Sequence, residues 1–591
     1  MSATADQRDE ALMFAGVAIL WVMGSMALIG PVALTIAAIT MTGTIIAGCQ
    51  IVGALVVIGV GAAVGILLWG ADAWLLGPLQ TMVDIYRDFL FDGHRFDFDG
   101  LITLFGRMLL NGSAWPYFAP VGVVAGGLYW IIWQVCTGNP IERSARAKSK
   151  RRPFASLMTR WGRQRLNHAA ADTADGSRIG IDKKSGKGID LADVDANKHA
   201  LVLGTIGSGK TVSVLNMVES AINRELPVVY VDGKGDYDLA RQVMAYAEDR
   251  GRPIYLFAMN GESCAYNPLA SGGYSAKKDR IVELREWSED HYRKLAEGYL
   301  QLVFKVLDTC GVETDLVSVA EYMSLGNLKA LIQKQGKGFA AAGRLLEAIK
   351  KRKPAEEHVE SLREEVWTLA ESEIGHLFDT ASVSECSPIL ELLPAIEEHA
   401  VVYFCLPALE FPALAKLVGK LVINDLKSAA AAQLIKPKAK RLPFYTIFDE
   451  FSVFAGEQVL NLINMGRGAG VHAVLATQSV ADIGRAVTNG PDHFIRQVFS
   501  SCNSYLIHRL NAAEDVTTIV ETIGTVDAVE HTAQVDLLGA TGMGSARQTK
   551  AFVIHPDEIK HLGRGEAMFV NKNRNLVKPI LVRHSAIDRI E

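Results

Sequence analysis

The sequence predicts an α/β fold built on a parallel sheet that carries a phosphate-binding loop, with an all-helical insertion and a preceding region of transmembrane helices. Three features of the 591-residue chain predict it. A complete phosphate-loop motif follows an apolar strand, short β-branched segments alternate with helical ones, and residues 11–71 contain no charged side chain. Because single cores rarely extend beyond about 250–300 residues, a chain of this length is expected to form several units.

The phosphate-loop motif lies at residues 204–211, directly after the apolar segment Leu-Val-Leu. Its glycines let backbone N–H groups surround the α and β phosphates, and the positive end of the following helix points toward them. Lys210 is expected to reach the β and γ phosphates, and the hydroxyl of Thr211 to bind Mg²⁺. The motif predicts ATP and Mg²⁺ as ligands, with nucleotide contacts from Gly204, Thr205, Ile206, Gly207, Ser208, Gly209, Lys210 and Thr211.

Short apolar segments rich in β-branched residues recur along the chain after residue 170. Almost continuous apolarity over such lengths is typical of central strands in a parallel sheet that is covered on both faces. Helical stretches such as 211–224 and 411–433 lie between these segments. The expected strands of this doubly wound sheet are 200–204, 227–231, 253–257, 400–405, 443–448, 472–477 and 503–508.

The strand pattern is absent between residues 277 and 380. Segments 278–308 and 340–375 are charged and place apolar residues at three- and four-residue spacing, which indicates amphipathic helices. One expected apolar stripe consists of Leu284, Trp287, Tyr292, Leu295 and Tyr299. We therefore divide the α/β part into 171–276 and 381–591, with an all-helical insertion at 277–380 that either contacts a substrate or partner or is an ordinary packing domain.

The uncharged stretch near the N-terminus is too long for one membrane span, since about 20 apolar residues cross the hydrocarbon core. We expect spans at 12–33, 46–69 and 115–135 within a membrane region of residues 1–140. Arg8 stands among acidic residues, which argues against a cleavable signal peptide. Three spans would place the N-terminus outside, and a re-entrant or interfacial first segment would place it inside.

A basic linker at residues 141–170 follows the last expected span. Nine lysines and arginines stand between Glu142 and His168, and basic residues beside a span mark the cytoplasmic side of the membrane. The nucleotide-binding part is therefore expected in the cytoplasm. The charge of the linker also suits contact with anionic lipid or nucleic acid.

Residues 444–450 place two carboxylates at the end of an apolar strand. Asp449 is expected to contact the nucleotide site and to support, through a water molecule, the Mg²⁺ bound by Thr211. Glu450 suits polarisation of the attacking water, the step that distinguishes a hydrolysing motor from a nucleotide-binding switch. An Asp-Glu pair is also a common helix start, but the intact phosphate loop favours the catalytic interpretation.

Two further residues are candidates for catalysis. Gln478 follows a strand expected beside that of Asp449, and its amide could sense the γ-phosphate. Arg467 lies in a Gly-flanked loop, where it could enter the site of a neighbouring subunit and stabilise charge on the γ-phosphate. Rival candidates for this arginine role are Arg485, Arg496 and Arg509.

The segment Asp-Gly-Lys-Gly at 232–235 follows the second expected strand and should place Asp232 and Lys234 near the phosphate loop. A plain polar turn is the alternative. The seven cysteines include no CxxC pair, which argues against a zinc site or a disulfide scaffold. No LSGGQ-like signature is present, which argues against an ABC transporter ATPase.

Taken together, these motifs resemble the type IV coupling proteins, the TraD/TraG-type membrane ATPases of conjugation and type IV secretion. The matching segments span roughly residues 195–590 and follow the expected membrane spans. They are GTIGSGKT at 204–211, D-x-K-G at 232–235, IFDEF at 447–451, GRGAG followed by LATQS within 466–479, and CNSYLIHRL at 502–510.

The resemblance implies a RecA-like P-loop fold, a homo-hexameric ring under the bacterial inner membrane, and DNA-stimulated ATP hydrolysis. Its implied partners are single-stranded DNA, a relaxase or relaxosome, and components of the secretion channel, with protein as an alternative substrate. The resemblance assigns catalytic roles to Glu450, Arg467 and Gln478. Among them, Arg467 would be an arginine finger that acts on the neighbouring subunit. Members usually have two spans, matched here by 46–69 and 115–135.

Two other functions remain open at the level of sequence. One is an FtsK/HerA-like DNA translocase, which would use the same chemistry. The other is a membrane receptor that uses nucleotide only to hold an assembly together, with little turnover. Glu450 and Arg467 argue against the receptor, because a static assembly needs neither residue.

Overall fold

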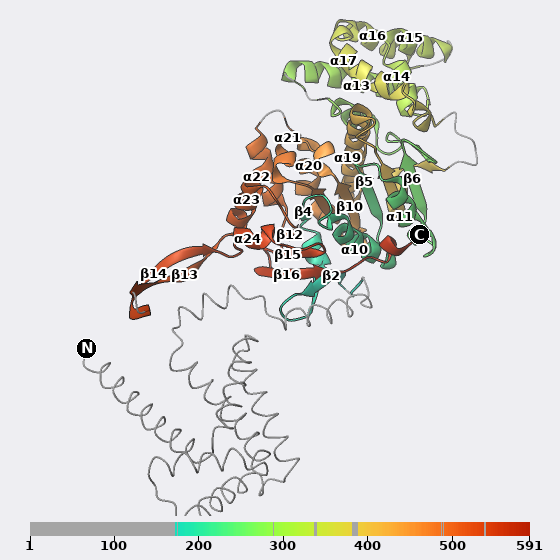
Figure 1. The fold of residues 1–591 in the computed structure, drawn as a ribbon. Coiled ribbons are helices and arrows are strands. Elements are labelled where there is room, and N and C mark those ends of the chain that lie inside the picture. The colour runs from blue at the N-terminus through green and yellow to red at the C-terminus, as the bar shows by residue number, and fades with distance from the viewer. Residues whose placement is uncertain are drawn as a thin grey trace, which may run out of the picture. The chain divides into compact units, whose positions relative to one another are not determined.

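The computed structural model describes residues 172–590, except for 174, 286, 288, 336–339, 381–387, 486, 488–489 and 537–538 (Figure 1). The expected spans at 12–33, 46–69 and 115–135 and the basic linker at 141–170 lie outside the described residues. Within the described part of the chain, no helix is both long enough and apolar enough to cross a bilayer.

The described part is organised around a mixed sheet of 12 strands in the order β1-β2-β16-β15-β12-β4-β11-β10-β5-β9-β6, with β3 paired to β2. Neighbouring strands from β12 to β6 run parallel. All the strands expected from the sequence are present in this parallel part. They are β4 (Ala200–Leu203), β5 (Val228–Asp232), β6 (Ile254–Ala258), β9 (Val401–Cys405), β10 (Phe444–Asp449), β11 (Val471–Thr477) and β12 (Ser504–Ile507).

Sequence reasoning missed the antiparallel side of the sheet. It contains β1 (Asp172–Thr173), β2 (Gly176–Asp182), β3 (Gly188–Ala192), β15 (Glu566–Asn571) and β16 (Leu576–Val582). Glycine weakens the strand pattern of β2, but it is required there by close packing. A Cβ at Gly180 would lie 2.1 Å from the carbonyl oxygen of Leu581 on β16, so a side chain would break this pairing.

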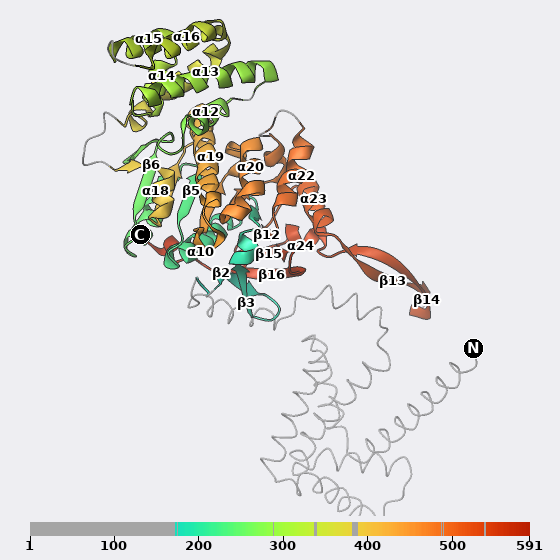
Figure 2. The same ribbon diagram turned by 180° about the vertical axis from the view of Figure 1, so that it is seen from behind.

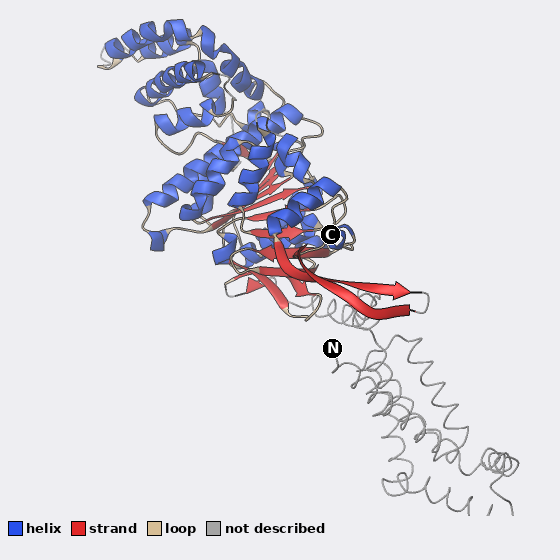
Figure 3. Ribbon diagram, turned by 90° about the vertical axis from the view of Figure 1, so that its left-hand side faces the viewer, coloured by secondary structure: helices blue, strands red, loops and turns tan. Residues whose placement is uncertain are grey.

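Helices cover both faces of the sheet (Figure 3). Along β4, Leu201 and Leu203 belong to one buried cluster, and Ala200 and Val202 belong to the other, as the period of two in a strand requires. Helices α10 (Lys210–Asn223) and α11 (Tyr237–Glu248) contribute to the second cluster. Helices α19 (Pro412–Ile435) and α20 (Glu457–Gly466) contribute to the first. Each fully buried Leu or Val contributes about 1.5–3 kcal/mol.

Among the described residues of the segment from 277 to 380, the regular elements are all helices or 3-10 turns, joined by short loops. Helices α13 to α17 stand together as a lobe in both views (Figures 1 and 2). The helices that start or form this lobe are α12 (Tyr274–Val282), α13 (Asp290–Thr309), α14 (Leu316–Tyr322), α15 (Leu325–Lys334), α16 (Ala342–Arg352) and α17 (Glu360–Ala370).

The helices expected within 278–308 are present as α12 and α13, but the single apolar stripe expected across them was wrong, because the helix is interrupted between Val282 and Asp290. The indole of Trp287 donates to the carbonyl oxygen of Val282 at 2.9 Å. This bond satisfies a helix-end carbonyl that would otherwise continue the helix. As a result, the expected apolar stripe is split: Leu284 and Trp287 precede α13, and Tyr292 is 38% exposed. Between 340 and 375, a 3-10 turn at Lys353–Ala355, which contains Pro354, lies between α16 and α17.

Strands β13 (Thr525–Asp536) and β14 (Gly539–Phe552) form a separate two-stranded ribbon (Figure 3). Sequence reasoning missed this ribbon, because residues 525–552 are rich in Gly, Ala and Thr and lack an apolar run. The remaining elements are α9 (Asp193–Ala196), β7 (Ala265–Tyr266), β8 (Ile389–Leu390), α18 (Leu392–Glu397), α21 (Val480–Arg485), α22 (Pro491–Ser501), α23 (Ala513–Ile523) and α24 (Pro556–Lys560).

Candidate functional site: a nucleotide pocket at the ends of parallel strands

The phosphate loop connects the carboxyl end of β4 to the first turn of α10. Gly207 and Gly209 have φ angles of 72° and 108°, a region that other residues enter only at a cost. Gly204 is required for a different reason, since a Cβ there would lie 2.6 Å from Cβ of His508. The N–H of Thr205 donates to the carbonyl oxygen of Arg509 at 3.0 Å, so the end of β12 helps to fix the loop.

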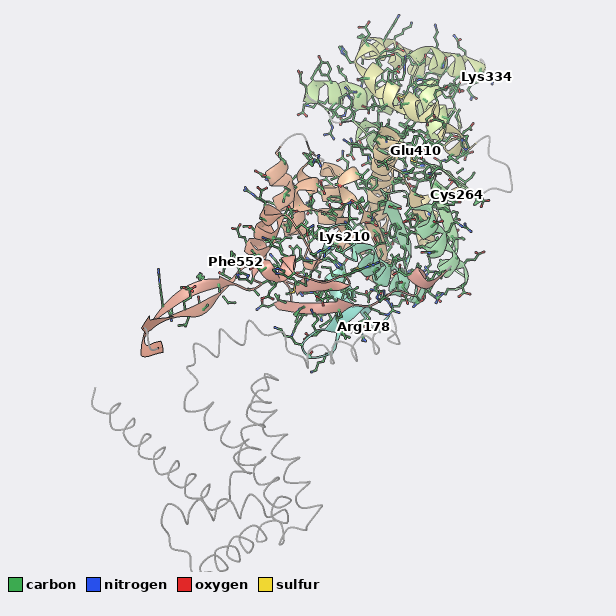
Figure 4. All side chains as sticks on the ribbon, viewed as in Figure 1. Arg178, Lys210, Cys264, Lys334, Glu410 and Phe552 are labelled. Carbon is green, nitrogen blue, oxygen red and sulfur yellow. The ribbon has the colours of Figure 1, made fainter. Side chains whose placement is uncertain are left out.

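Lys210 is the first residue of α10 and is 5% exposed (Figure 4). Its Nζ has no hydrogen-bond partner among the described residues, and neither does the buried Oγ of Ser208. Burial lowers the pKa of Lys210, an effect that the carboxylates of Glu450 and Asp449 oppose. Buried polar atoms without partners are costly. An ammonium and a hydroxyl without hydrogen bonds at this loop therefore fit the phosphates of a nucleotide.

Asp449 ends β10 and is fully buried. Its Oδ2 accepts a hydrogen bond from the hydroxyl of Tyr230 at 3.1 Å, and its Oδ1 accepts one from the N–H of Glu450 at 3.1 Å. Glu450 has a φ of 55° and a ψ of 51°, a left-handed conformation that costs about 1–3 kcal/mol for a non-glycine residue. Strained backbone conformations of this kind are common at functional sites. Here the conformation determines the direction of the Glu450 side chain.

Gln478 and Lys234 complete the carboxylate side of the site. The amide Nε2 of Gln478 donates to Oε1 of Glu450 at 3.0 Å. Nζ of Lys210 lies 3.5 Å from the same oxygen, and Nζ of Lys234 lies 3.7 Å from it. Burial alone would lower the pKa of Lys234, but the carboxylates of Asp449 and Glu450 outweigh it and raise that pKa. The structure thus brings together Lys210, Glu450 and Gln478. It also places the 232–235 segment next to the phosphate loop, as expected from the sequence.

Beneath these residues, Asp232 is paired with Asp449 in the register of β5 and β10. Tyr403 donates to Oδ2 of Asp232 at 3.1 Å. The rings of Tyr230 and Tyr403 stack with centroids 4.6 Å apart, so two tyrosine hydroxyls serve two neighbouring carboxylates. Burial and the charge of Asp449 raise the pKa of Asp232 to about 6. Asp232 therefore lies in the sheet beside Asp449 and does not line the pocket itself.

A pocket of about 220 Å³ lies over the phosphate loop. Residues expected from the sequence that line it are Thr205, Ile206, Gly207, Gly209, Lys210, Thr211, Lys234, Glu450 and Gln478. Gly204, Ser208 and Asp449 are not among its lining residues. Sequence reasoning missed the other side of the pocket, which consists of Val212, Arg564, Gly565, Val582 and His584. The short Gly-Arg-Gly sequence at 563–565 indicates a tight turn but does not indicate that this turn lies at the pocket.

The structure does not bring Arg467 to the pocket of its own chain. It is exposed and precedes β11 at the amino end of the parallel strands, whereas the phosphate loop lies at their carboxyl end. The seven residues of β11 separate the two edges by about 20 Å at roughly 3.3 Å per residue. Arg485, Arg496 and Arg509 are also exposed and do not line the pocket.

A neutral histidine supports the phosphate loop from behind. His508 is fully buried, with Nε2 2.9 Å from the hydroxyl of Ser213 and Nδ1 3.1 Å from the carbonyl oxygen of Glu566. Burial lowers its pKa from 6.5 to about 4. His508 therefore links β12, α10 and the start of β15 without adding charge next to Lys210.

His508 should make the fold sensitive to acid. Its folded pKa is below the unfolded value, so the unfolded chain takes up a proton between pH 6.5 and 4 that the folded chain does not. The stabilisation is fully present above about pH 6.5 and is lost as the pH falls toward 4, which amounts to about 2 kcal/mol at pH 5. Urea unfolding at pH 7 and pH 5 should show a smaller loss for His508→Gln than for the unchanged chain. The exposed His561→Gln should leave the loss unaltered, and equal losses in all three proteins would contradict the assignment.

The fold and the pocket define a P-loop protein with a site that suits the phosphates of a nucleotide. Residues 443–564 match a family model described as the TraM recognition site of TraD and TraG, and residues 178–247 match one described as helicase HerA-like C-terminal. The chain is 22% identical over 368 residues to the type 4 coupling protein DotL of Legionella pneumophila, a match that covers 51% of this chain and 46% of DotL. These matches confirm that the chain is similar to the type IV coupling proteins and has an FtsK/HerA-like relation, as the motifs indicate.

Solved structures show a weaker likeness. The bacterial conjugative coupling protein TrwBdeltaN70 has a TM-score of 0.48 and 12% identity, covering 71% of this chain and 90% of that one. VirB4 of Thermoanaerobacter pseudethanolicus has a TM-score of 0.44 and 14% identity, covering 71% of this chain and all of its own. Both scores are below 0.5, so the fold assignment rests on the sheet and the phosphate loop described above.

Proposed function

We propose that the chain is an inner-membrane coupling ATPase of a conjugative type IV secretion system. It hydrolyses ATP to deliver relaxase-bound single-stranded DNA, or a protein substrate, to the transfer channel. The observation that carries this proposal is the convergence of Lys210, Glu450 and Gln478 on one pocket over the phosphate loop. The sequence likeness to a type 4 coupling protein and to the TraM recognition site of TraD and TraG supports a role in type IV secretion.

The residues present fit ATP and Mg²⁺. Nζ of Lys210 and Oγ of Ser208, which lack hydrogen bonds within the described residues, would bind phosphate oxygens. The hydroxyl of Thr211 with Asp449, through water, would hold Mg²⁺. When bound, Mg²⁺ neutralises charge on the β and γ phosphates. Glu450 orients the attacking water and accepts its proton. Gln478, whose amide donates a hydrogen bond to Glu450, responds to the presence or loss of the γ-phosphate. Since it lies between β11 and α21, a change in its position would be transmitted to these two elements.

The same proposal includes a head-to-tail ring of six copies, in which Arg467 acts on the pocket of the neighbouring subunit. The exposed position of Arg467 at the opposite edge of the sheet from its own pocket supports this role. The uncharged N-terminal stretch supports a multi-pass anchor in the inner membrane, and the basic linker supports a pocket on the cytoplasmic side. The relaxosome and the channel are the partners.

DNA dependence of turnover tests the function. We expect the full-length protein, purified in detergent, to hydrolyse ATP several-fold faster with single-stranded DNA than without it, because a motor hydrolyses only when its substrate engages the ring. Steady-state phosphate release would measure this. Lys210→Ala, which should hydrolyse nothing with or without DNA, is the control for contaminating ATPases.

Other outcomes separate the alternatives. ATP turnover that DNA does not change would contradict the delivery of DNA, and a protein substrate would remain as the alternative. Stimulation by duplex DNA alone would favour an FtsK/HerA-like translocase, to which the match at residues 178–247 is related. Nucleotide binding without turnover would favour a receptor that nucleotide only stabilises.

A further inference from the structure

The nucleotide pocket has a second wall that comes from the antiparallel strands at the end of the chain. Gly565 and Val582 lie where β15 and β16 begin and end, and the N–H of Val582 donates to the carbonyl oxygen of Gly565 at 2.9 Å. The N–H of Gly565 donates to the carbonyl oxygen of Ser208 at 3.3 Å. The wall is therefore attached to the phosphate loop of its own subunit.

The turn that carries Arg564 is fixed on both sides. The carboxylate of Glu566 forms an ion pair with Lys183 at 2.7 Å and accepts a hydrogen bond from the N–H of Gly563 at 3.0 Å. Gly565 has a φ of 75°, which a side chain would disfavour. The backbone of this turn is therefore fixed before a ligand binds, so the entropy lost on binding is limited to that of the side chain.

The contacts of this wall place it at the nucleoside end of the pocket. Lys210, Glu450 and Gln478 mark the γ-phosphate end, since the lysine of a phosphate loop reaches the β and γ oxygens. The wall instead contacts Ser208 and approaches Gly209, whose Cβ would lie 3.6 Å from N of Gly565. These loop residues and the start of α10 surround the α and β phosphates. The side chains of the wall thus face the α-phosphate, the ribose and the base.

The chemistry of the wall suits that ligand. Arg564 is exposed, and no hydrogen bond or ion pair of its guanidinium is found within the described residues, although it lines the pocket. His584 is exposed and lines the pocket beside the apolar Val582. A guanidinium binds phosphate through paired N–H donors, and an imidazole ring next to a valine offers a flat surface to a base.

We infer that Arg564 binds the α-phosphate of the nucleotide in its own subunit and that His584, with Val582, receives the nucleoside. This inference rests on the proposed function only in that nucleotide must enter the pocket. It assigns two arginines to separate tasks: Arg564 serves affinity within one subunit, and Arg467 serves turnover across the interface.

Equilibrium binding to the full-length protein in detergent tests the inference, with ATP, ADP and inorganic tripolyphosphate as ligands. Arg564→Ala should raise the Kd for ATP and for ADP by the same factor, about 10- to 100-fold, because a charge-assisted hydrogen bond is lost at a phosphate that both contain. His584→Ala should weaken ATP and ADP but leave tripolyphosphate unchanged. Arg547→Ala, which removes an exposed arginine from β14, is the matched control and should change nothing.

Two results would overturn the inference. An unchanged Kd for Arg564→Ala would remove Arg564 from the site, and a loss for ATP but not for ADP would place it at the γ-phosphate. Equal thermal unfolding of the variant and the unchanged chain without nucleotide shows that folding is not the cause. Binding is independent of DNA and of turnover, so failure of the proposed coupling function would leave these measurements interpretable.

Discussion

Replacing Glu450 by Gln is expected to lower kcat for ATP hydrolysis by roughly 100- to 10,000-fold, the usual share of a general base. The carboxylate is 8% exposed and accepts a hydrogen bond from Gln478, so it is positioned toward the pocket. Glutamine keeps the size of the side chain but cannot accept a proton from water. Nucleotide affinity should stay the same or rise, because one negative charge near the γ-phosphate is removed.

Two further variants separate binding from chemistry. Lys210→Ala should lose both nucleotide affinity and turnover, since the ammonium that meets the phosphates is gone. Glu457→Gln, an exposed carboxylate in the first turn of α20, should match the unchanged chain in both. Steady-state phosphate release and equilibrium binding of ATP measure the two quantities. Full turnover by Glu450→Gln would show that another group activates the water.

The parts of the site that could be predicted share one physical property. Each of them is a short sequence motif at the carboxyl end of a strand, and these strands are parallel and adjacent. In the registers of the sheet, Asp449 lies beside Asp232, and Thr477, just before Gln478, lies beside Leu203, just before the phosphate loop. Parallel strands bring their carboxyl ends to one edge, so motifs that are far apart in the chain meet there. Local sequence and strand direction were therefore enough to place Lys210, Glu450 and Gln478 together.

The wall formed by Arg564 and His584 could not be predicted in this way. Its place depends on antiparallel pairing between β15, β16 and β12 and on a hydrogen bond from Gly565 to Ser208. These contacts join residues far apart in sequence, and no local pattern specifies them. Similarly, the break before α13 accompanies a hydrogen bond from Trp287 to Val282, in a segment that contains no Gly or Pro to mark it in the sequence.

Arg467→Ala is expected to lower kcat by roughly 1,000-fold or more, the range for an arginine finger, without changing the Kd for ATP. Arg467 lies at the amino edge of the sheet and does not line the pocket, so it contributes nothing to binding within its own subunit. In the proposed ring, its guanidinium would act on the pocket of a neighbouring copy, at the γ-phosphate beside Glu450. Arg485→Ala, which removes an arginine whose side chain is 83% exposed, is the matched control and should retain turnover.

A mixture of two inactive variants tests action across the interface. In a ring with head-to-tail contacts, an Arg467→Ala subunit still offers an intact pocket, and a Glu450→Gln subunit still offers an intact arginine. An equal mixture should recover about one quarter of the unchanged turnover, the share of random interfaces that join an intact Glu450 to an intact Arg467. Subunit exchange would be verified by energy transfer between fluorescent labels. Turnover by Arg467→Ala alone, or no recovery in mixtures with verified exchange, would contradict a finger supplied by the neighbour.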